Sequence, residues 1–401
     1  MSEPITVLFL SSAVKGQRCI EAFKAAGCKT YLLTEERWRD DAWPYGVIDG
    51  VHYMQSLNNR QHVINAVAWM NRGLRIDLIM PLDEYEIETA AVVREHLQMP
   101  GMSVSAAHVF NDKLAMRMRA AAAGIAVPEF SRVSNYDELR EFMQRVPGPW
   151  LLKPRNEAGS MGIKRCEDAD RVWRALEQLG DQQSHYLLEK FVPSDVFHVD
   201  SIISDGDIRF SCASAYGRPP LTVSHGGGVF TTRTLAADSA DAIALGAANA
   251  RVLETLGLRS GVAHVEFLRT VADKRWLFLE AAARVGGANI SDMIEHATGI
   301  NPWVEWARLE LAAQRGDAYA LPALKHDHAG ILVCLSHVER PDLSAYADPE
   351  VVWRMDKPYH AGMIVASPNA DRVRQLLDSY AERLAADFLA RAQPLDTARS
   401  A

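Results

Sequence analysis

Two glutamates in the last third of the chain, Glu266 and Glu280, lie in short apolar runs that flank a polar turn at Val271–Lys274. If the turn is centred on residue 273, the runs form a hairpin in which the two glutamates are direct cross-strand neighbours. Their Cβ atoms would be roughly 5 Å apart. Two carboxylates at that distance repel unless a cation lies between them or one is protonated. The pair predicts either a cation site or two solvent-facing strand glutamates.

The same register places further residues around the two glutamates. It pairs Leu268 with Phe278 and His264 with Ala282, and the alternation of a strand puts all four on the face of the glutamates. The residues that follow offer a guanidinium and bare backbone: Arg284, Gly286 and Gly287. Paired oxygen ligands followed by an arginine suit a magnesium ion that carries phosphates.

A strand–loop–strand stretch, WLLKPRNEAGSMGIKRC, carries Lys153 and a loop with Gly159, Ser160 and Gly162. Glycines let backbone N–H groups approach a phosphate, and the lysine adds positive charge beside them. A plain hairpin turn would explain the same glycines. Neither GxxxxGK[ST] nor GxGxxG occurs in the chain, so a Walker A loop and a dinucleotide site are not indicated. Lys113 stands at the start of a predicted helix, and from this position alone we expect a lysine on the surface.

A hydrolase is the competing interpretation of this loop. AGSMG nearly matches the nucleophile elbow GxSxG, and HGGG at 225–228 is similar to an oxyanion loop. However, HGGG follows the serine instead of preceding it, and the predicted loop joins two strands. No HExxH motif or paired-histidine spacing occurs, so a zinc hydrolase is not indicated either.

Composition excludes several classes of protein. The 401 residues carry a formal net charge of -8, which argues against a general nucleic-acid or anionic-membrane binder. The five cysteines are scattered without a CxxC pair, so they predict reduced thiols in a cytoplasmic protein. The N-terminus lacks a basic region before its short apolar run, and no apolar run approaches the roughly 18 residues that span a bilayer.

Strands alternate with helices over the first hundred residues, which predicts a parallel α/β sheet. ITVLFL (5–10) is a doubly buried strand, and PLDEYE (81–86) lies at the end of another, where such sheets place ligands. An acidic helix start would explain PLDEYE equally well. Later, Asp205-Gly206 predicts a tight hairpin, and 218–232 predicts a loop. The tail predicts strands near 330–336 and 359–366 and a helix from about 369 to 390.

Taken together, these stretches resemble the ATP-grasp superfamily, in the branch of carboxylate–amine ligases that includes amino acid and peptide ligases. The resemblance rests on Lys113, LLKPRNEAGSMGI, LLEKFVPSDVFHVDSII, and HVEF followed by WLFLEAAARVGG. It implies an α/β and α+β chain, with a Rossmann-like pre-ATP-grasp domain, an ATP-grasp fold and a C-terminal α+β portion. The implied divisions are 1–105 for the first domain, 106–192 and 193–315 for the small and large ATP-grasp subdomains, and 316–401 for the C-terminal part.

By resemblance, Lys113 and Lys153 contact phosphates of ATP, and Glu266 and Glu280 hold magnesium, or manganese in its place. The loop that covers the phosphates corresponds to Gly159, Ser160, Met161 and Gly162. The segment that reads adenine corresponds to Glu189, Lys190, Phe191 and Val192. The apolar floor beneath the base corresponds to Leu268 and Phe278.

Other implied roles concern the reaction. Arg284 resembles the arginine that neutralises the transferred phosphoryl group, and backbone N–H groups at Gly286 and Gly287 are expected to stabilise an oxyanion. The residues implied to be catalytic are Arg284, Lys153 and Gly287. The expected substrate-facing residues are His225, Gly226, Gly227, Arg284, Gly286 and Gly287.

Two positions depart from the family pattern. Ala282 stands where the family often has an asparagine that binds metal, and His264 opposite it could fill part of the gap. The ribose-binding acid aligns with Val196, so Asp195 or His198 is expected to take its place.

The resemblance implies an ATP- and Mg²⁺-dependent ligase that joins a small carboxylic acid to an amine, with amino acids among the candidates, through an acyl phosphate. Two alternatives stay open: a biotin-carboxylase-like or purine-pathway carboxylase that uses bicarbonate, and a nucleotide-binding protein without catalysis. No nucleic-acid or membrane partner is expected, and fold-level analogy suggests a homodimer.

Overall fold

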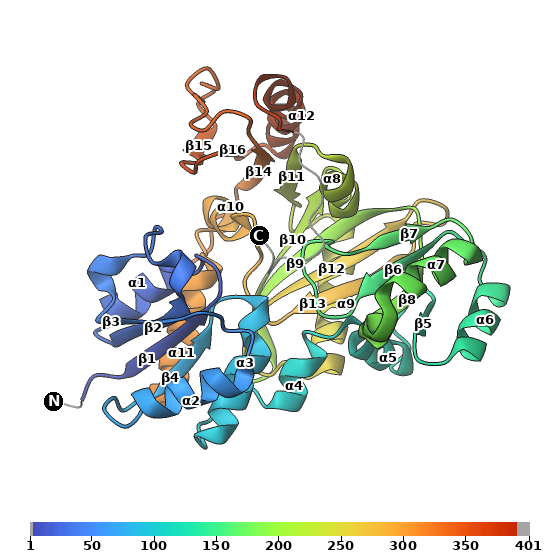
Figure 1. The fold of residues 1–401 in the computed structure, drawn as a ribbon. Coiled ribbons are helices and arrows are strands. Elements are labelled where there is room, and N and C mark those ends of the chain that lie inside the picture. Colours follow the sequence, from blue (N-terminus) through green and yellow to red (C-terminus); the bar gives the residue numbers. More distant parts are fainter. Residues whose placement is uncertain (1–2, 391–401) are drawn as a thin grey trace.

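The computed structural model describes residues 3–390, and this part of the chain contains three β-sheets (Figure 1). The N-terminal sheet is parallel, with the strand order β3-β2-β1-β4. Its first strand is buried at every residue, as the continuous apolar run predicts. The strands are β1 (Thr6–Ser11), β2 (Lys29–Glu35), β3 (Gly50–Met54) and β4 (Leu78–Pro81).

Helices connect and cover this sheet. α3 begins directly after β4, where Asp83 accepts a 2.7 Å hydrogen bond from the backbone N–H of Glu84 and caps the helix. This brings the acidic start of α3 to the carboxyl ends of the strands. The helices are α1 (Gln17–Ala25), α2 (Arg60–Met70), α3 (Glu84–His96) and α4 (Val104–Val109), with short 3₁₀ turns at Glu36–Trp38 and Tyr45–Val47.

A second, antiparallel sheet has the order β5-β8-β6-β7. Apolar side chains of α6 and α7 bury one of its faces, around Phe142, Trp150 and Leu176. α5 precedes this sheet in the chain. The elements are α5 (Lys113–Ala122), β5 (Phe130–Arg132), α6 (Tyr136–Arg145), β6 (Trp150–Pro154), β7 (Lys164–Cys166), α7 (Ala169–Leu179), a 3₁₀ turn (Gly180–His185) and β8 (Tyr186–Lys190).

The third sheet has eight strands in the order β13-β12-β9-β10-β11-β14-β16-β15. The hairpin predicted at Asp205-Gly206 is confirmed: both residues have positive φ, 57° and 91°, as a two-residue turn of this kind needs. The strands are β9 (Ser194–Ser204), β10 (Asp207–Tyr216), β11 (Phe230–Thr234), β12 (Gly261–Thr270), β13 (Trp276–Ala282), β14 (His328–Leu335), β15 (Val351–Arg354) and β16 (His360–Ser367).

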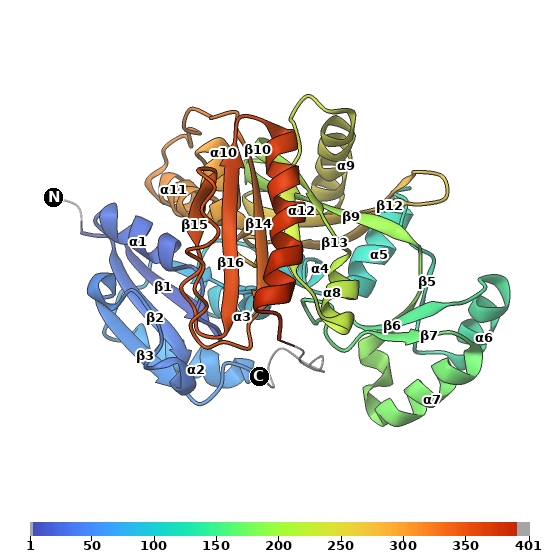
Figure 2. The same cartoon turned by 90° about the horizontal axis from the view of Figure 1, so that it is seen from above.

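Helices pack around the large sheet at separate places. α12 lies along β14 and β16 (Figure 2), and α11 packs against α1 in one core with the N-terminal sheet. The helices are α8 (Pro220–Gly226), α9 (Ala240–Leu256), α10 (Ile290–Thr298), α11 (Pro302–Arg315) and α12 (Ala370–Asp387).

Two details of the sequence prediction need correction. The stretch 218–232, predicted as a loop, contains the short helix α8 and most of β11, because Pro219 and Pro220 start a helical turn. The edge strand β15 was not predicted. The large sheet also runs continuously across the predicted division at residue 315, so that division stays a prediction.

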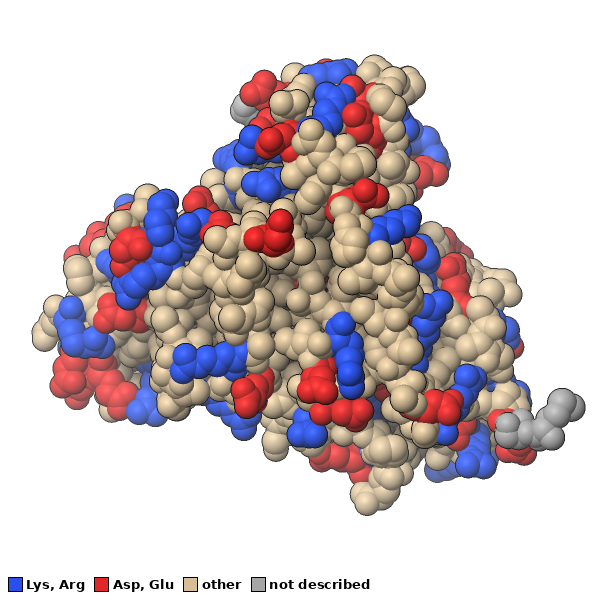
Figure 3. Space-filling model, turned by 180° about the vertical axis from the view of Figure 1, so that it is seen from behind, with Lys and Arg blue, Asp and Glu red and all other residues tan. Residues whose placement is uncertain are grey.

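Charged residues of both signs share the surface, and the helices are short or polar. Lysines and arginines are interspersed with aspartates and glutamates over the face seen in Figure 3, without a continuous basic patch on it. Between residues 3 and 390, every helix is too short or too polar to cross a bilayer.

Candidate functional site

The hairpin of β12 and β13 has the predicted register at its open end. Glu266 lies opposite Glu280, and His264 lies opposite Ala282. Lys113 from α5 lies 3.1 Å from Glu280 and pairs with it. The repulsion between the two carboxylates is therefore countered in part by a lysine from another element.

The predicted pairing of Leu268 with Phe278 is wrong. The register shifts after Glu266, so that Phe267 lies opposite Phe278, and Leu279 is the extra residue of a β-bulge. Phe278 consequently packs against Phe267 in the core, with ring centroids 6.2 Å apart. Leu279, and not Phe278, joins Leu268 as apolar lining of the pocket described next.

A pocket lies between the small sheet and the face of the hairpin that carries the two glutamates. It is lined by many of the residues singled out in the sequence: Lys113, Lys153, Ser160, Met161, Glu189, Lys190, Phe191, Val192, Leu268, Glu266 and Glu280. Residues singled out that do not line it are Gly159, Gly162, Asp195, His198, His225, Gly226, Gly227, Phe278, Arg284, Gly286 and Gly287.

The two lysines of the pocket are both held by carboxylates. Lys153 pairs with Glu189, and Lys113 pairs with Glu280 and donates a 2.6 Å hydrogen bond to the carbonyl of Glu157. Burial alone would raise the pKa of Glu280, but Lys113 lowers it to about 2. Burial would likewise lower the pKa of Lys113, but Glu280 raises it above its usual value. Lys113 and Glu280 are therefore both charged at neutral pH.

The loop between β6 and β7 has the backbone that its glycines predict. Gly159, Ser160 and Gly162 have φ values of 65°, 64° and 66°, a conformation that favours glycine. His225 of α8 donates a 3.3 Å hydrogen bond from Nε2 to the carbonyl of Ser160. The first turn of α8, beginning at Pro220, lines the same pocket. The glycine loop and α8 thus meet at one edge of the pocket.

Neither residue predicted at the ribose position lies in the pocket. His198 is fully buried, with Nδ1 2.7 Å from Asp200 and Nε2 2.8 Å from the hydroxyl of Thr232. Asp195 is exposed, outside the pocket. Ser194 lines the pocket instead, and its place two residues after Val192 was the signal in the sequence.

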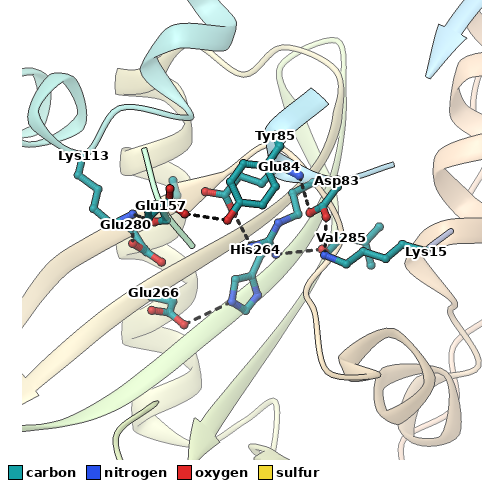
Figure 4. A network of polar contacts seen from close by, with 12 residues as sticks. Lys15, Asp83, Glu84, Tyr85, Lys113, Glu157, His264, Glu266, Glu280 and Val285 are labelled. Carbon is teal, nitrogen blue, oxygen red and sulfur yellow. Dashed lines mark hydrogen bonds and ion pairs between the residues drawn. The ribbon is translucent and has the colours of Figure 1, made fainter. Parts of the chain in front are cut away.

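A hydrogen-bonded chain of buried groups leads from His198 to Glu266. Asp200 contacts both His198 and His264, the latter at 2.9 Å from Nδ1. His264 Nε2 lies 3.5 Å from Glu266 (Figure 4). The hydroxyl of Tyr216 donates a 2.7 Å hydrogen bond to Glu266. Tyr216 and Asp200 carry no motif of their own, so the sequence did not single them out.

His264 should make the fold's stability depend on pH. Burial would lower the pKa of His264, but Asp200 and Glu266 raise it to about 9 from 6.5. A raised folded-state pKa contributes stability that is complete below pH 6.5 and lost as pH rises to 9. The neighbouring His198 has a lowered pKa and Tyr216 a raised one, so both titrate outside this window.

We therefore expect the melting temperature of the wild type to fall between pH 6.5 and 9, and that of His264→Gln to fall less. Thermal unfolding of both proteins across this range measures the effect. Parallel curves for the two proteins would contradict the assignment.

Arg284 lies between the hairpin and α3, the helix that follows β4 of the N-terminal sheet. It donates hydrogen bonds to Glu84 at 2.7 Å and to the carbonyl of Val285 at 3.0 Å. Burial would lower the pKa of Arg284, but Glu84 raises it above its usual value, so the guanidinium is charged. The acidic start of α3 thus reaches the site. The sequence had left two interpretations of PLDEYE open, a position for a ligand and an acidic helix start. Figure 4 shows Glu84, Asp83 and Tyr85 facing the hairpin.

Two other contacts hold the start of α3 in place near this region. Lys15 pairs with Asp83 at 2.7 Å, and Tyr85 donates a 3.0 Å hydrogen bond to Glu157 of the glycine loop. The lysine and the tyrosine come from segments about seventy residues from their partners, which explains why the sequence did not predict these contacts.

The two glycines after Arg284 differ in their surroundings. A Cβ on Gly286 would lie 2.7 Å from Asp200 Oδ1 and 3.0 Å from His264 Nδ1, so only glycine fits there. A Cβ on Gly287 would meet no atom within 4 Å. Gly286 therefore packs the turn against the buried Asp200–His264 pair, and Gly287 leaves its backbone accessible before α10.

The donor set fits a hard divalent cation. Glu266 and Glu280 present carboxylate oxygens from adjacent positions on two strands, and the low pKa of Glu280 keeps that group ionised. Oxygen ligands of this kind suit Mg²⁺ and Mn²⁺. Ala282 offers no ligand, and the imidazole of His264 is occupied by Asp200 at Nδ1.

Sequence comparison finds related ligases, while no family model matches the chain. The chain is 26% identical over 234 residues to an L-arginine-specific L-amino acid ligase from Bacillus subtilis, covering 57% of this chain and 56% of the relative. It is 25% identical over 265 residues to an alanine–anticapsin ligase from Bacillus subtilis, covering 60% and 55%. The chain thus matches little more than half the length of these curated relatives.

Solved structures match over nearly the whole chain. An L-amino acid ligase from Bacillus licheniformis superposes with a TM-score of 0.78 at 15% identity, covering 98% of this chain and 100% of that one. An N5-carboxyaminoimidazole ribonucleotide synthetase from Thermus thermophilus gives a TM-score of 0.73 at 18% identity, covering 96% and 99%. These similarities support the fold implied by the sequence motifs. The chain therefore has the ATP-grasp fold, and over little more than half of their length its sequence is similar to amino acid ligases.

Proposed function

We propose that this protein is an ATP- and Mg²⁺-dependent ligase that joins a small carboxylic acid to an amine and releases ADP and phosphate. The observation that carries the proposal is the pocket in which two lysines face the paired carboxylates of Glu266 and Glu280. Cationic groups for phosphate and oxygen ligands for a divalent cation are the parts that phosphoryl transfer needs. The sequence relatives include ligases of amino acids.

ATP would bind with its base near the segment that joins β8 to β9. Lys190, Phe191 and Val192 line the pocket there, next to the apolar side chains of Leu268 and Leu279. This arrangement suits a flat base held by backbone groups above an apolar floor. Ser194 is then the nearest polar side chain of β9 for the ribose.

The triphosphate would extend toward the hairpin. Lys153 and Lys113 supply positive charge, and the glycine loop around Ser160 supplies backbone N–H groups. Both lysines pair with carboxylates in this structure, so phosphate would have to share or replace those partners. Glu266 and Glu280 would hold Mg²⁺, which supplies charge neutralisation on the phosphate oxygens.

The reaction would proceed in two steps. A carboxylate oxygen of the acid attacks the γ-phosphorus and the bond to ADP breaks, which gives an acyl phosphate. The amine then attacks the acyl carbon, phosphate leaves, and the amine loses one proton. Arg284, held by Glu84, would neutralise charge on the transferred group, and the backbone near Gly287 would face the oxyanion.

Substrate recognition would involve the N-terminal domain and α8. From α3, Glu84 reaches Arg284 and Tyr85 reaches the glycine loop, and His225 reaches the same loop from α8. Amino acids are the favoured acid and amine, because the relatives matched by sequence are amino acid ligases. The four predicted divisions of the chain and a homodimer remain part of this proposal.

ADP release should require an acid and an amine together. With ATP and Mg²⁺, pairs drawn from amino acids and small carboxylic acids should give phosphate release for at least one pair, and either component alone should stay near background. A coupled phosphate assay over the matrix of pairs measures this, with mass spectrometry of the amide. Glu280→Gln protein serves as the inactive control.

A carboxylase is the second candidate, because the fold also matches an N5-carboxyaminoimidazole ribonucleotide synthetase. ADP formation that depends on bicarbonate without any organic acid would favour it over the ligase. Tight ATP binding without ADP release under every pair would favour a protein that binds nucleotide without catalysis.

A further inference from the structure

The largest fully buried side chain among residues 3–390 is an arginine. Arg117, on α5, is 1% exposed. Removing a charged group from water costs several kcal/mol, so a buried guanidinium needs good partners. Its neighbours on the helix, Met116 and Ala120, belong to the apolar core. The position of this charge therefore calls for a reason other than packing.

The guanidinium of Arg117 joins three elements of the fold. Nε and Nη2 each lie 2.7 Å from one carboxylate oxygen of Glu189, on β8 of the small sheet. Nη1 donates a hydrogen bond to the carbonyl of Leu279, on β13 of the large sheet. α5 thus connects the two sheets between which the pocket lies.

Both partners of Arg117 lead into the pocket. The second oxygen of Glu189 accepts a hydrogen bond from Lys153, so one carboxylate is shared by Arg117 and the lysine placed near phosphate. Leu279 directly precedes Glu280 and lines the pocket itself. Arg117 lies outside the pocket. It contacts Glu189, which holds Lys153, and it contacts Leu279, the residue before Glu280.

The contact with Leu279 is made at the bulge of β13. In a regular strand, Leu279 and Glu280 would point to opposite faces, and the bulge is what lets both line the pocket. An extra residue in a strand leaves backbone groups outside the ladder, and Arg117 satisfies the carbonyl at this point. The guanidinium fork can hold this carbonyl and a carboxylate at once, which a lysine ammonium on a single stem cannot.

We propose that Arg117 is a positioning residue that fixes the bulge at Leu279 and, with the bulge, the direction of Glu280. Through Glu189, Arg117 also holds Lys153 in position. This inference rests on the proposed function, because it assigns Glu280 to the cation. Arg117 does not line the pocket. In the wild type, Mg²⁺ should increase the affinity for nucleotide. Replacement of Arg117 should make this increase smaller.

The test compares ADP binding with Mg²⁺ and with EDTA, by calorimetry, for the wild type, Arg117→Lys and Arg119→Lys. Arg119 lies on the same helix and donates to the carbonyl of Leu256, away from the pocket, so its variant is a matched control. In Arg117→Lys, the gain in affinity provided by Mg²⁺ should fall by about tenfold or more, as for other groups that orient metal ligands. In Arg119→Lys it should stay unchanged.

A second variant guards against misfolding. Arg117→Met leaves the Glu189 carboxylate paired with the Lys153 ammonium, so no buried charge at this point is left without a partner. Its Mg²⁺-dependent gain should fall in the same way, at a melting temperature near that of the wild type. An unchanged gain in whichever variant folds would overturn the inference alone. Absence of ADP binding by the wild type would overturn the proposed function and the inference together.

Discussion

Glu280→Gln should lower the rate of ADP release in the presence of both substrates by at least about a thousandfold, because a lost metal ligand removes several kcal/mol of charge stabilisation. The amide keeps the volume of the side chain but removes the charge that a divalent cation needs. Although burial raises the pKa of the Glu280 carboxyl, Lys113 lowers it to about 2, so the wild-type group is ionised throughout the assay range.

The variant should remain folded. The side chain of Glu280 is 30% exposed, so it keeps contact with water. Lys113 keeps its hydrogen bond to the carbonyl of Glu157 when the charge of Glu280 is removed. Thermal unfolding and circular dichroism check this, and Glu177→Gln, an exposed change on α7, is the control for turnover. Near-normal turnover by folded Glu280→Gln would remove Glu280 from the cation site.

Arg284→Lys should lower kcat by about 10²–10³, the loss usual when one preorganised donor to a developing charge is removed. The guanidinium of Arg284 contacts Glu84 and the carbonyl of Val285 with two separate nitrogens, which fixes its plane. A lysine keeps the charge but presents a single ammonium, so it cannot be held by Glu84 and face the transferred group in the same geometry.

The comparison of kcat with KM separates this role from ATP binding. Since Arg284 does not line the nucleotide pocket, KM for ATP should change little while kcat falls. Arg308→Lys, at an ion pair on the outer side of α11, should leave both constants unchanged. A rise in KM for ATP with normal kcat would contradict the role given to Arg284.

Local patterns in the sequence were enough for the hairpin and its paired glutamates. A turn centred on residue 273 predicts which residues face one another, and the strands keep this register at the open end of the hairpin, beyond the bulge. Glu266 opposite Glu280 follows from that register, as does His264 opposite Ala282. Helix ends are local in the same way: α9 ends at Gly257, whose positive φ terminates the helix.

Only the tertiary structure decided how the hairpin departs from that regular register. The bulge at Leu279 coincides with contacts made from far along the chain: Arg117 bonds its carbonyl, and the N–H of Phe278 donates to the carbonyl of Ala126. No turn or periodicity in the hairpin itself encodes these partners. For that reason the sequence assigned Phe278 to the pocket, and the structure places Leu279 there.

The same limit applies to the other corrections. His198 was a candidate for ribose from its position in the chain, but Asp200 and Thr232 occupy both of its nitrogens inside the large sheet. The sequence by itself determined which residue types stand where β-strands and turns can present them. Which side chains then meet was decided by packing, because pairs such as Arg284 and Glu84, two hundred residues apart, form only when whole sheets and helices come together.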